Sequence, residues 1–206
     1  MHCTDSESVP TQHRRPDGSF DLRPLSYATA SQVLSAVGPI VDALYPQGGE
    51  RFAGRLQDVL QGYARCTVAQ IGQRVVGVAV ETPKGARRVK LSTLWVHPIW
   101  RRRGVGSALL RGVTRDWLLE DIERVHLTVA VSEYTSIFGL LNRFSFQHLE
   151  VERNRYGIGR DEAILACQCS DLADAWERQT QSPNSPNEEL FALRRTSALS
   201  RTLHAA

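Results

Sequence analysis

The feature that most constrains the fold is a basic, glycine-containing turn between a predicted strand and a predicted helix, at residues 96–110. Gly104 and Gly106 lack a Cβ atom, so a ligand can approach the backbone of the turn closely. An apolar stripe at helical spacing follows, made of Val105, Leu109, Val113 and Trp117. The first N–H groups of a helix have no acceptor within it, and with the helix dipole they bind anions. The sequence therefore predicts a phosphate-binding site where the strand meets the helix.

Positive charge is concentrated around this turn. The run from Lys84 to Arg115 carries nine Lys and Arg residues and no Asp or Glu, whereas the net charge of the whole chain is only +3. Such a run favours an anionic partner, either the phosphates of a cofactor or a nucleic acid. The turn is not a Walker loop or a Rossmann fingerprint, because the Gly-Lys-Ser/Thr and the third glycine are missing. A nucleic-acid-binding protein ranks last, because the run lacks a recognition helix and interleaved aromatic residues.

Apolar periodicity predicts a mixed α/β fold in the order strand, two helices, three strands, helix, strand, helix, two strands. Thr29 and Gln32 fit a capping box for the first helix, and we expect Gly38-Pro39 to break or kink it. Gly72-Gln73 predicts a hairpin turn. The expected strands are 20–25, 66–71, 75–80, 89–96, 125–131, 146–151 and 163–169, and the expected helices begin near residues 29, 52, 105 and 134.

The strand over residues 89–96 changes phase along its length. Val89 and Leu91 share one face by the period of two, whereas Leu94 and Val96 have the opposite parity. One extra residue near Ser92-Thr93 would return all four side chains to a common face. The sequence therefore predicts a β-bulge there.

Length and composition fit one domain with flanking segments. The 206 residues are 42% hydrophobic, enough for a single core. We expect a flexible leader at 1–19, a domain at 20–169, and a C-terminal extension at 170–206 with a linker and a short helix near 188–203. No apolar run is long enough to cross a membrane and the first residues do not resemble a secretion signal, so we predict a cytoplasmic protein. Cys167 and Cys169 should be buried thiols on one face of a strand, with no metal site.

Residues 101–106, with the sequence Arg-Arg-Arg-Gly-Val-Gly, resemble the Arg/Gln-x-x-Gly-x-Gly/Ala pattern of the GCN5-related N-acetyltransferase (GNAT) family. The order of elements over residues 20–169 is similar as well. The resemblance implies an α/β fold, in which a central bulged, splayed mixed β-sheet is flanked by helices, and acetyl-CoA as co-substrate without a metal. It implies that the backbone of Leu94, Trp95 and Val96 pairs with the pantetheine arm. The pyrophosphate would be held by Arg101, Arg102, Arg103, Gly104, Val105, Gly106 and Ser107.

The activity implied is transfer of the acetyl group to a primary amine by direct attack in a ternary complex. The acceptor is left open between a small molecule, a protein amine and an aminoacyl-RNA; a homodimer is compatible with the sequence, and no membrane partner is expected. In many family members a Glu and a Tyr handle the proton, but the corresponding residues here are Lys90 and Leu141. A catalytically silent acyl-CoA-binding or regulatory module is therefore the alternative.

Three other residues are candidates for proton transfer: Glu81, Tyr134 and Tyr156. Glu81 is expected at the end of the strand beside the bulged one, where it would hold a water as a base or simply be a solvated carboxylate. Tyr134 begins a helix and Tyr156 lies in a long turn, so each hydroxyl could donate a proton or serve only in packing. Asp161 and Glu162 precede the last strand, where they could attract a cationic substrate or form a solvated turn.

Overall fold

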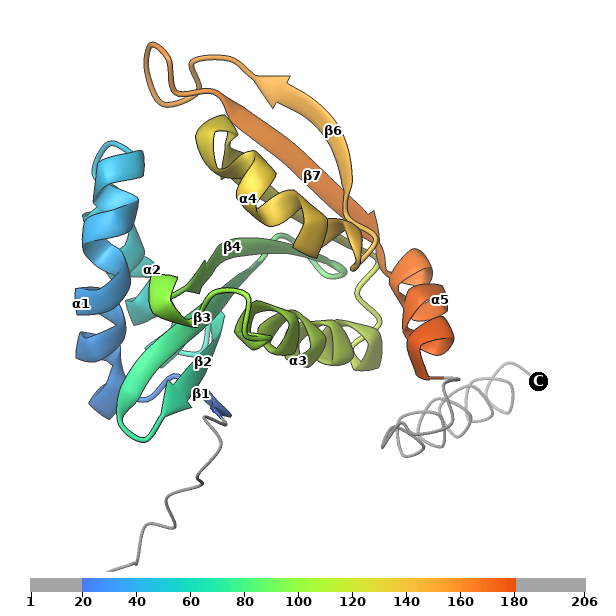
Figure 1. The fold of residues 1–206 in the computed structure, drawn as a ribbon, viewed down its shortest axis with the longest axis horizontal. Coiled ribbons are helices and arrows are strands. Elements are labelled where there is room, and N and C mark those ends of the chain that lie inside the picture. Colours follow the sequence, from blue (N-terminus) through green and yellow to red (C-terminus); the bar gives the residue numbers. More distant parts are fainter. Residues whose placement is uncertain (1–19, 181–206) are drawn as a thin grey trace, which may run out of the picture.

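The structure is a computed structural model in which residues 20–180 are described (Figure 1). The predicted leader and the predicted helix near 188–203 lie outside the described residues. Within residues 20–180, no helix is both long enough and apolar enough to span a bilayer.

A seven-stranded mixed sheet forms the centre of the fold, in the order β1-β2-β3-β4-β5-β7-β6. Every neighbouring pair is antiparallel except β4 and β5, which are parallel. The expected hairpin at Gly72-Gln73 is confirmed, since Ile71 pairs with Arg74. The strands are β1 (Asp21–Pro24), β2 (Arg65–Ile71), β3 (Arg74–Pro83), β4 (Arg88–Val96), β5 (Arg124–Ala130), β6 (Gln147–Glu152) and β7 (Glu162–Gln168).

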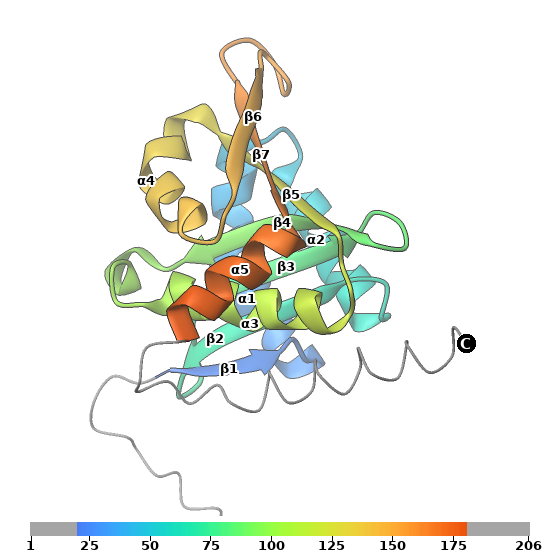
Figure 2. The ribbon, with the colours of Figure 1, turned by 90° about the vertical axis from the view of Figure 1, so that its right-hand side faces the viewer.

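Helices cover both faces of the sheet and occur in the predicted order. One face carries α1 (Tyr27–Leu44) and α2 (Gly48–Leu60), and the other carries α3 (Val105–Leu119) and α4 (Val131–Asn142). Figure 2 shows α3 and α5 (Cys169–Thr180) in front of the sheet, with α1 behind it. A 3₁₀ turn, η1 (Pro98–Trp100), connects β4 to the turn before α3. The predicted mixed α/β architecture is confirmed.

The sheet separates two apolar cores. The larger core lies under α3 and α4 and includes Leu109, Trp117 and Leu141, all fully buried. The smaller core lies under α1 and α2 and includes Val37 and Phe52. At Gly77 on β3, an added Cβ would lie 2.8 Å from Val105 Cγ1, so glycine is required for α3 to pack this close to the sheet.

The cap of α1 differs from the prediction. Ser26 is the N-cap, and Thr29 is the third helical residue, whose Oγ1 accepts a hydrogen bond from Ser26 N at 3.1 Å. Thr29 was expected to be the cap itself, but the extended backbone of Ser26 sets the helix start three residues earlier. Of the break or kink expected at Gly38-Pro39, the break is wrong, since α1 continues to Leu44; losing one donor toward the preceding turn does not end the helix.

A helix that the sequence did not predict, α5, follows β7. Cys169 is the first residue of α5, so it does not share a strand face with Cys167, although both thiols are buried as expected. The backbone N–H of Cys169 donates to Glu123 O at 2.8 Å, which turns the chain out of the sheet. Leu172 on α5 is only 2% exposed and belongs to the larger core. The packed unit therefore continues beyond residue 169.

Candidate functional site

A β-bulge lies in the middle of β4. Val80 on β3 pairs with Thr93, but the next residue, Glu81, pairs with Leu91, so Ser92 has no opposite residue. The bulge predicted at Ser92-Thr93 is confirmed. It brings Leu94 to the face that Leu91 occupies, so both contact the larger core.

Beyond the bulge, β4 and β5 separate. The two strands pair only where Arg88–Lys90 lie beside Arg124–His126. In the described part of the chain, the remainder of β4 up to Val96 has a strand neighbour only on the β3 side. Figure 1 shows β4 diverging from β7, with α4 above the gap. The backbone at Leu94, Trp95 and Val96 therefore forms an open strand edge that an extended ligand can pair with.

The turn after β4 presents backbone donors at the start of α3. The first hydrogen bond of α3 runs from Ala108 N to Gly104 O, so the N–H groups of Val105, Gly106 and Ser107 precede it. Gly104 is left-handed, with φ of 84°, and an added Cβ there would meet no atom within 4 Å. An added Cβ on Gly106 would lie 2.9 Å from Leu140 Cδ2 on α4, so the side chain of Leu140 packs close against this glycine.

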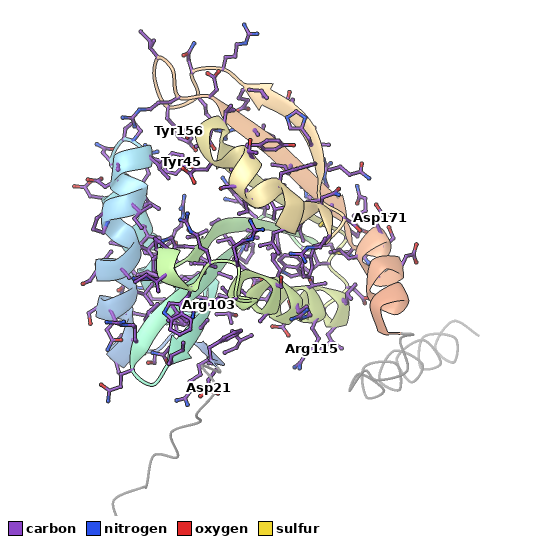
Figure 3. All side chains as sticks on the ribbon, viewed as in Figure 1. Asp21, Tyr45, Arg103, Arg115, Tyr156 and Asp171 are labelled. Carbon is purple, nitrogen blue, oxygen red and sulfur yellow. The ribbon has the colours of Figure 1, made fainter. Side chains whose placement is uncertain are left out.

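The arginines of the turn are exposed but not all are extended into solvent. Arg101 Nε donates to Val96 O at 3.3 Å, and the guanidinium of Arg103 lies 5.1 Å from the centre of the Trp100 ring (Figure 3). Arg102 has a left-handed backbone, with φ of 64°. The turn thus combines positive side chains with the N–H groups of α3, an arrangement suited to a pyrophosphate.

Glu81 is buried in the larger core rather than solvated at a strand end. It lies inside β3, it is 2% exposed, and its Oε1 accepts hydrogen bonds from Trp117 Nε1 and from Arg65 Nη2, the latter at 3.1 Å. Burial raises the pKa of Glu81, and Arg65 and the Trp117 indole oppose that rise. Its strand partner Leu91 contacts the core under α3, whereas Lys90 points to the other face. Glu81 therefore lies on the opposite face of the sheet from Lys90.

Tyr134 lies on α4, on the same side of the sheet as α3. Its ring stacks on Phe138 at 5.0 Å and meets His148 edge to face at 5.6 Å. Leu141 is fully buried in the same core. His97, beyond the end of β4, accepts a hydrogen bond from Ile99 N through Nδ1 at 3.3 Å and so caps the 3₁₀ turn.

The opposite face of the sheet carries a second group of polar side chains, called here the polar cluster: Tyr45, Arg55, Lys90, Thr128, Tyr156 and Glu162. Two residues of β5 connect this group: His126 pairs with Lys90 on β4, and Ala130 pairs with Glu162 on β7. Partners in a sheet share a face, so Lys90, Thr128 and Glu162 all point away from the core under α3 and α4.

The remaining members of the polar cluster come from helices and a turn. Tyr45 follows α1, Arg55 lies on α2, and Tyr156 lies in the turn between β6 and β7. The rings of Tyr45 and Tyr156 are 5.1 Å apart, and Figure 3 shows them side by side. Arg160 Nη1 also donates to Leu44 O at 3.1 Å, which joins the same turn to the end of α1.

Glu162 is the most buried member of the polar cluster, at 1% exposure. Burial raises its pKa, and hydrogen bonds from the hydroxyls of Thr128 and Tyr45 oppose that rise. Within residues 20–180 its Oε2 has no hydrogen-bond partner. Burial and the nearby Glu162 charge raise the pKa of Tyr45. A buried carboxylate with one oxygen unsatisfied is suited to bind or deprotonate a ligand.

Burial lowers the pKa values of the two cations of the polar cluster, whereas it raises those of Glu162 and Tyr45. Burial lowers the pKa of Lys90, and the charge of Arg55 lowers it further. Burial also lowers the pKa of Arg55. The arrangement therefore holds two acids with raised pKa values, Glu162 and Tyr45, and two cations with lowered pKa values on one face of the sheet.

Sequence reasoning did not assign a role to Tyr45 or Arg55, and it offered Glu162 only as a solvated turn residue or an attraction for a cation. Of the three proposed proton-transfer residues, Tyr156 lies in the polar cluster, whereas Tyr134 and Glu81 lie on the other side of the sheet. One signal was present for Glu162: in the alternation of β7 it falls out of phase with the buried Ala163, Leu165 and Cys167.

Known proteins match this chain at the level of a domain family and of the fold. The model of the acetyltransferase (GNAT) family matches residues 39–139. No curated protein matches the sequence.

Three solved structures illustrate the likeness, and at identities below 20% they bear on the fold alone. A proposed GNAT acetyltransferase from Desulfovibrio desulfuricans has a TM-score of 0.63 at 19% identity, covering 73% of this chain and 99% of that one. The ribosomal-protein-S18-alanine N-acetyltransferase from Escherichia coli has a TM-score of 0.59 at 16% identity, covering 73% and 94%. A GNAT family acetyltransferase from Elizabethkingia anophelis with acetyl-CoA bound has a TM-score of 0.57 at 15% identity, covering 72% and 97%.

Proposed function

Because the chain carries an acetyltransferase domain of the GNAT family, an acyltransferase class, we propose that it transfers the acetyl group of acetyl-CoA to a primary amine by direct attack in a ternary complex. One observation carries the proposal: β4 and β5 separate after Lys90, and the open edge of β4 leads directly to the amino end of α3. A thioester with a long amide-containing arm and a pyrophosphate fits this combination of an open strand edge and a helix end.

The proposed binding site for acetyl-CoA follows from these two features. We assign the backbone of Leu94, Trp95 and Val96 to the amides of the pantetheine arm. The pyrophosphate would accept hydrogen bonds from the N–H groups of Gly104, Val105, Gly106 and Ser107, with charge supplied by Arg101, Arg102 and Arg103. Gly104 leaves room for the phosphates, because an added Cβ there has no neighbour within 4 Å.

The transfer itself forms one bond and breaks another. The lone pair of a neutral amine attacks the thioester carbonyl carbon, the new N–C bond forms, and the C–S bond breaks with its electron pair leaving on sulfur. The nitrogen then has a proton to lose and the thiolate one to gain. Holding both reactants in one site supplies much of the acceleration by itself.

We propose Glu162 as the group that receives the proton from the amine. It lies on the face of the sheet that carries Lys90, it is buried, and Oε2 has no partner within residues 20–180. Burial raises its pKa above the ordinary value of 4.5, which makes the carboxylate a stronger base than an exposed one. Tyr156 is close enough to Tyr45 for their rings to touch, and we retain its hydroxyl as a candidate donor toward the leaving sulfur.

The other two residues proposed from the sequence receive different roles. Glu81 faces α3 and is hydrogen-bonded to Trp117, so we assign it to the stability of the core. Tyr134 packs between Phe138 and His148 on the side of α3 and α4. We assign it to the packing of α4 beside the cofactor. A cytoplasmic location and a homodimer stay predictions from the sequence.

Calorimetry with acetyl-CoA, followed by thiol release across a panel of amines, tests the proposal. We expect acetyl-CoA to bind and to raise the melting temperature, since it is selective for the folded state. We expect free thiol to appear only when a suitable amine is present. No binding at millimolar acetyl-CoA would refute the proposal, and binding without thiol release on any amine would favour the silent acyl-CoA-binding module.

A further inference from the structure

Two cations of the polar cluster have no role in the transfer chemistry described so far. Arg55 on α2 and Lys90 on β4 are both half-buried. Within residues 20–180 neither forms an ion pair with a carboxylate, although Arg65, Arg87 and Arg155 all do. Two cations held partly out of water and near each other raise the free energy of the folded protein unless an anion joins them.

Further positive charge lies close to the same place. The charge of Lys84 lowers the pKa of Lys90 and also that of His126, its strand neighbour. For His126 burial is the larger cause, followed by Lys90. This end of β4 therefore has an excess of positive charge on the face that carries the polar cluster.

The phosphates of acetyl-CoA do not account for these cations. Lys90 lies where β4 and β5 are still paired, whereas the turn that we assign to the pyrophosphate follows the other end of β4. Val96 is six positions along β4 from Lys90, which corresponds to roughly 20 Å. Lys90 also faces α1 and α2, and α3 covers the opposite face. The cations therefore belong to the side on which the acceptor would bind.

A negative group accompanies the two cations. Glu162 is buried on the same face, and its charge is among those that act on Lys90. A ligand that matches the cluster carries both signs: a negative group toward Arg55 and Lys90, and an amine toward Glu162. A polyamine would bring further positive charge against Arg55 and Lys90.

The contacts at the edge of the polar cluster, between the end of α1 and the turn between β6 and β7, favour a small ligand. The turn between β6 and β7 is joined to the end of α1 by the contact of Tyr45 with Tyr156 and by the hydrogen bond from Arg160 to Leu44 O. These contacts join the end of α1 to the turn between β6 and β7, where Figure 3 shows Tyr45 and Tyr156 side by side, and Tyr45 is hydrogen-bonded to Glu162. A folded protein or a structured RNA would have to displace them to reach Glu162.

From this juxtaposition we propose that the acceptor is a small amino acid, an amine that also carries a carboxylate. Arg55 and Lys90 bind the carboxylate, and the amine lies beside Glu162. The proposal rests on the proposed function and narrows its acceptor.

The first experiment compares each amino acid with its own amide. Thiol release from acetyl-CoA is measured with the standard amino acids, β-alanine and 4-aminobutyrate, and with the corresponding carboxamides and spermidine. Each pair has about the same size, but the amide has a less basic α-amine, so rates are compared per neutral amine to isolate the negative charge. We expect at least one acid to be acetylated with a kcat/KM roughly 10- to 100-fold above that of its amide, as for a charged hydrogen-bonded group.

The second experiment removes the cations one at a time. Arg55→Gln and Lys90→Gln should each raise the KM for the acid by roughly 10- to 100-fold, with little change for the amide and in the Kd for acetyl-CoA. Arg51→Gln is the matched control, because Arg51 is an exposed arginine one turn earlier on α2. It should leave both substrates unaffected.

Several results would overturn the inference. Equal use of acids and amides, preference for spermidine, transfer to none of the acids, or equal losses of both substrates in Arg55→Gln would each do so. Failure of the proposed function looks different, because acetyl-CoA then does not bind in calorimetry. Acetylation of peptides or aminoacyl-RNA but of no free amino acid would leave the transferase standing and refute the amino-acid acceptor.

Discussion

The rings of Tyr45 and Tyr156 meet edge to face, with centroids 5.1 Å apart and planes at 74°. Tyr45 caps the carboxyl end of α1, and Tyr156 lies in the turn between β6 and β7. The contact therefore joins two distant parts of the chain beside Glu162, and burial, followed by the Glu162 charge, raises the pKa of Tyr45. It is the simplest place to separate a packing role from a proton-transfer role.

Tyr156→Phe and Tyr156→Ala should have different effects. Phe keeps the ring contact and loses only the hydroxyl, so we expect kcat to fall by about 10-fold or less, below the usual range for a general acid. Ala also removes the contact, so we expect an added loss of about 1 kcal/mol in unfolding free energy and a higher acceptor KM. Steady-state kinetics and denaturant unfolding measure both. If Tyr156→Phe falls to background while still binding acetyl-CoA, Tyr156 is a dedicated acid.

Glu162 should control the acid limb of the pH profile. The carboxylate must be ionised to accept a proton, and burial raises its pKa above 4.5. We therefore expect kcat/KM to rise with pH through that raised pKa and then to level off. A separate rise at higher pH should follow as the ammonium group of the acceptor loses its proton. Glu162→Gln should lower kcat by about 10²–10⁴-fold and remove only the lower limb.

Glu152→Gln provides the control for Glu162. Glu152 is the strand partner of Glu162 on β6 and forms an ion pair with Arg155, but it is not buried. This variant should keep both limbs of the profile. A Glu162→Gln enzyme with an unchanged rate and an unchanged acid limb would exclude Glu162 as the base.

The glycine turn allows a test of charge at constant size. Gly104→Asn and Gly104→Asp place side chains of about equal volume at a position with open space, and both variants carry the backbone strain of its left-handed φ of 84°. Asp sets a negative charge against the pyrophosphate, so we expect its Kd for acetyl-CoA to exceed that of Asn by at least about 10-fold. Acetyl-pantetheine lacks the pyrophosphate and should not distinguish the two variants. Equal affinities for acetyl-CoA would place the pyrophosphate elsewhere.

Local patterns predicted the bulge in β4 and the turn before α3 well. The parity change from Leu91 to Leu94 can be read in the sequence, because a strand has a strict period of two, and it located the bulge correctly. The turn before Val105 was equally readable, since its glycines and the apolar stripe of the helix are neighbours in sequence.

The polar cluster could not be predicted in the same way. Tyr45, Arg55 and Glu162 come from different elements and meet only through packing, so no local pattern links them. Glu81 was placed at a strand end because the apolar run stops at Val80. In the structure β3 continues to Pro83, and Trp117 and Arg65 supply the hydrogen bonds that allow a carboxylate in the core.

The run of nine basic residues is divided between two places in the folded protein. Lys84 and Lys90 lie near one end of β4, and Arg101 to Arg103 follow the other end. Arg87 is neutralised by an ion pair with Glu123. A single block in the sequence therefore becomes two positive regions, one suited to the pyrophosphate and one to the acceptor.

Helix α5 should be required for stability, unlike the residues that follow it. Leu172 is 2% exposed in the larger core, so Leu172→Ala should lower the unfolding free energy by about 2–5 kcal/mol. Deleting residues 181–206 should leave both stability and acetyl-CoA binding intact, whereas deleting 170–206 removes Leu172 and should destabilise the domain. Thermal unfolding with and without acetyl-CoA measures all three variants. A folded, fully stable 1–169 protein would show that α5 is dispensable.

Glu81 should affect stability through pH and should not affect catalysis. Burial raises its pKa above 4.5, so between 4.5 and the raised value the folded protein holds a proton that the unfolded chain has released. The folded state then binds more protons, and its unfolding free energy falls as pH rises through that window and levels off above it. Glu81→Gln cannot ionise, so it should gain stability relative to the natural protein as pH rises through the window. Other buried carboxyls, including Glu162, titrate in both proteins and cancel in the difference.

Glu120→Gln is the control for that comparison. Glu120 is exposed and shares Arg65 with Glu81, and exposed ion pairs contribute little, so its curve should run parallel to that of the natural protein. Turnover by Glu81→Gln should stay within a few-fold of the natural enzyme, because Glu81 faces α3 while the polar cluster lies on the opposite face of the sheet. Parallel stability curves for Glu81→Gln and the natural protein would refute the raised pKa. A collapse of turnover in a stable Glu81→Gln protein would return Glu81 to the list of candidate bases, since a purely structural carboxylate has no part in proton transfer.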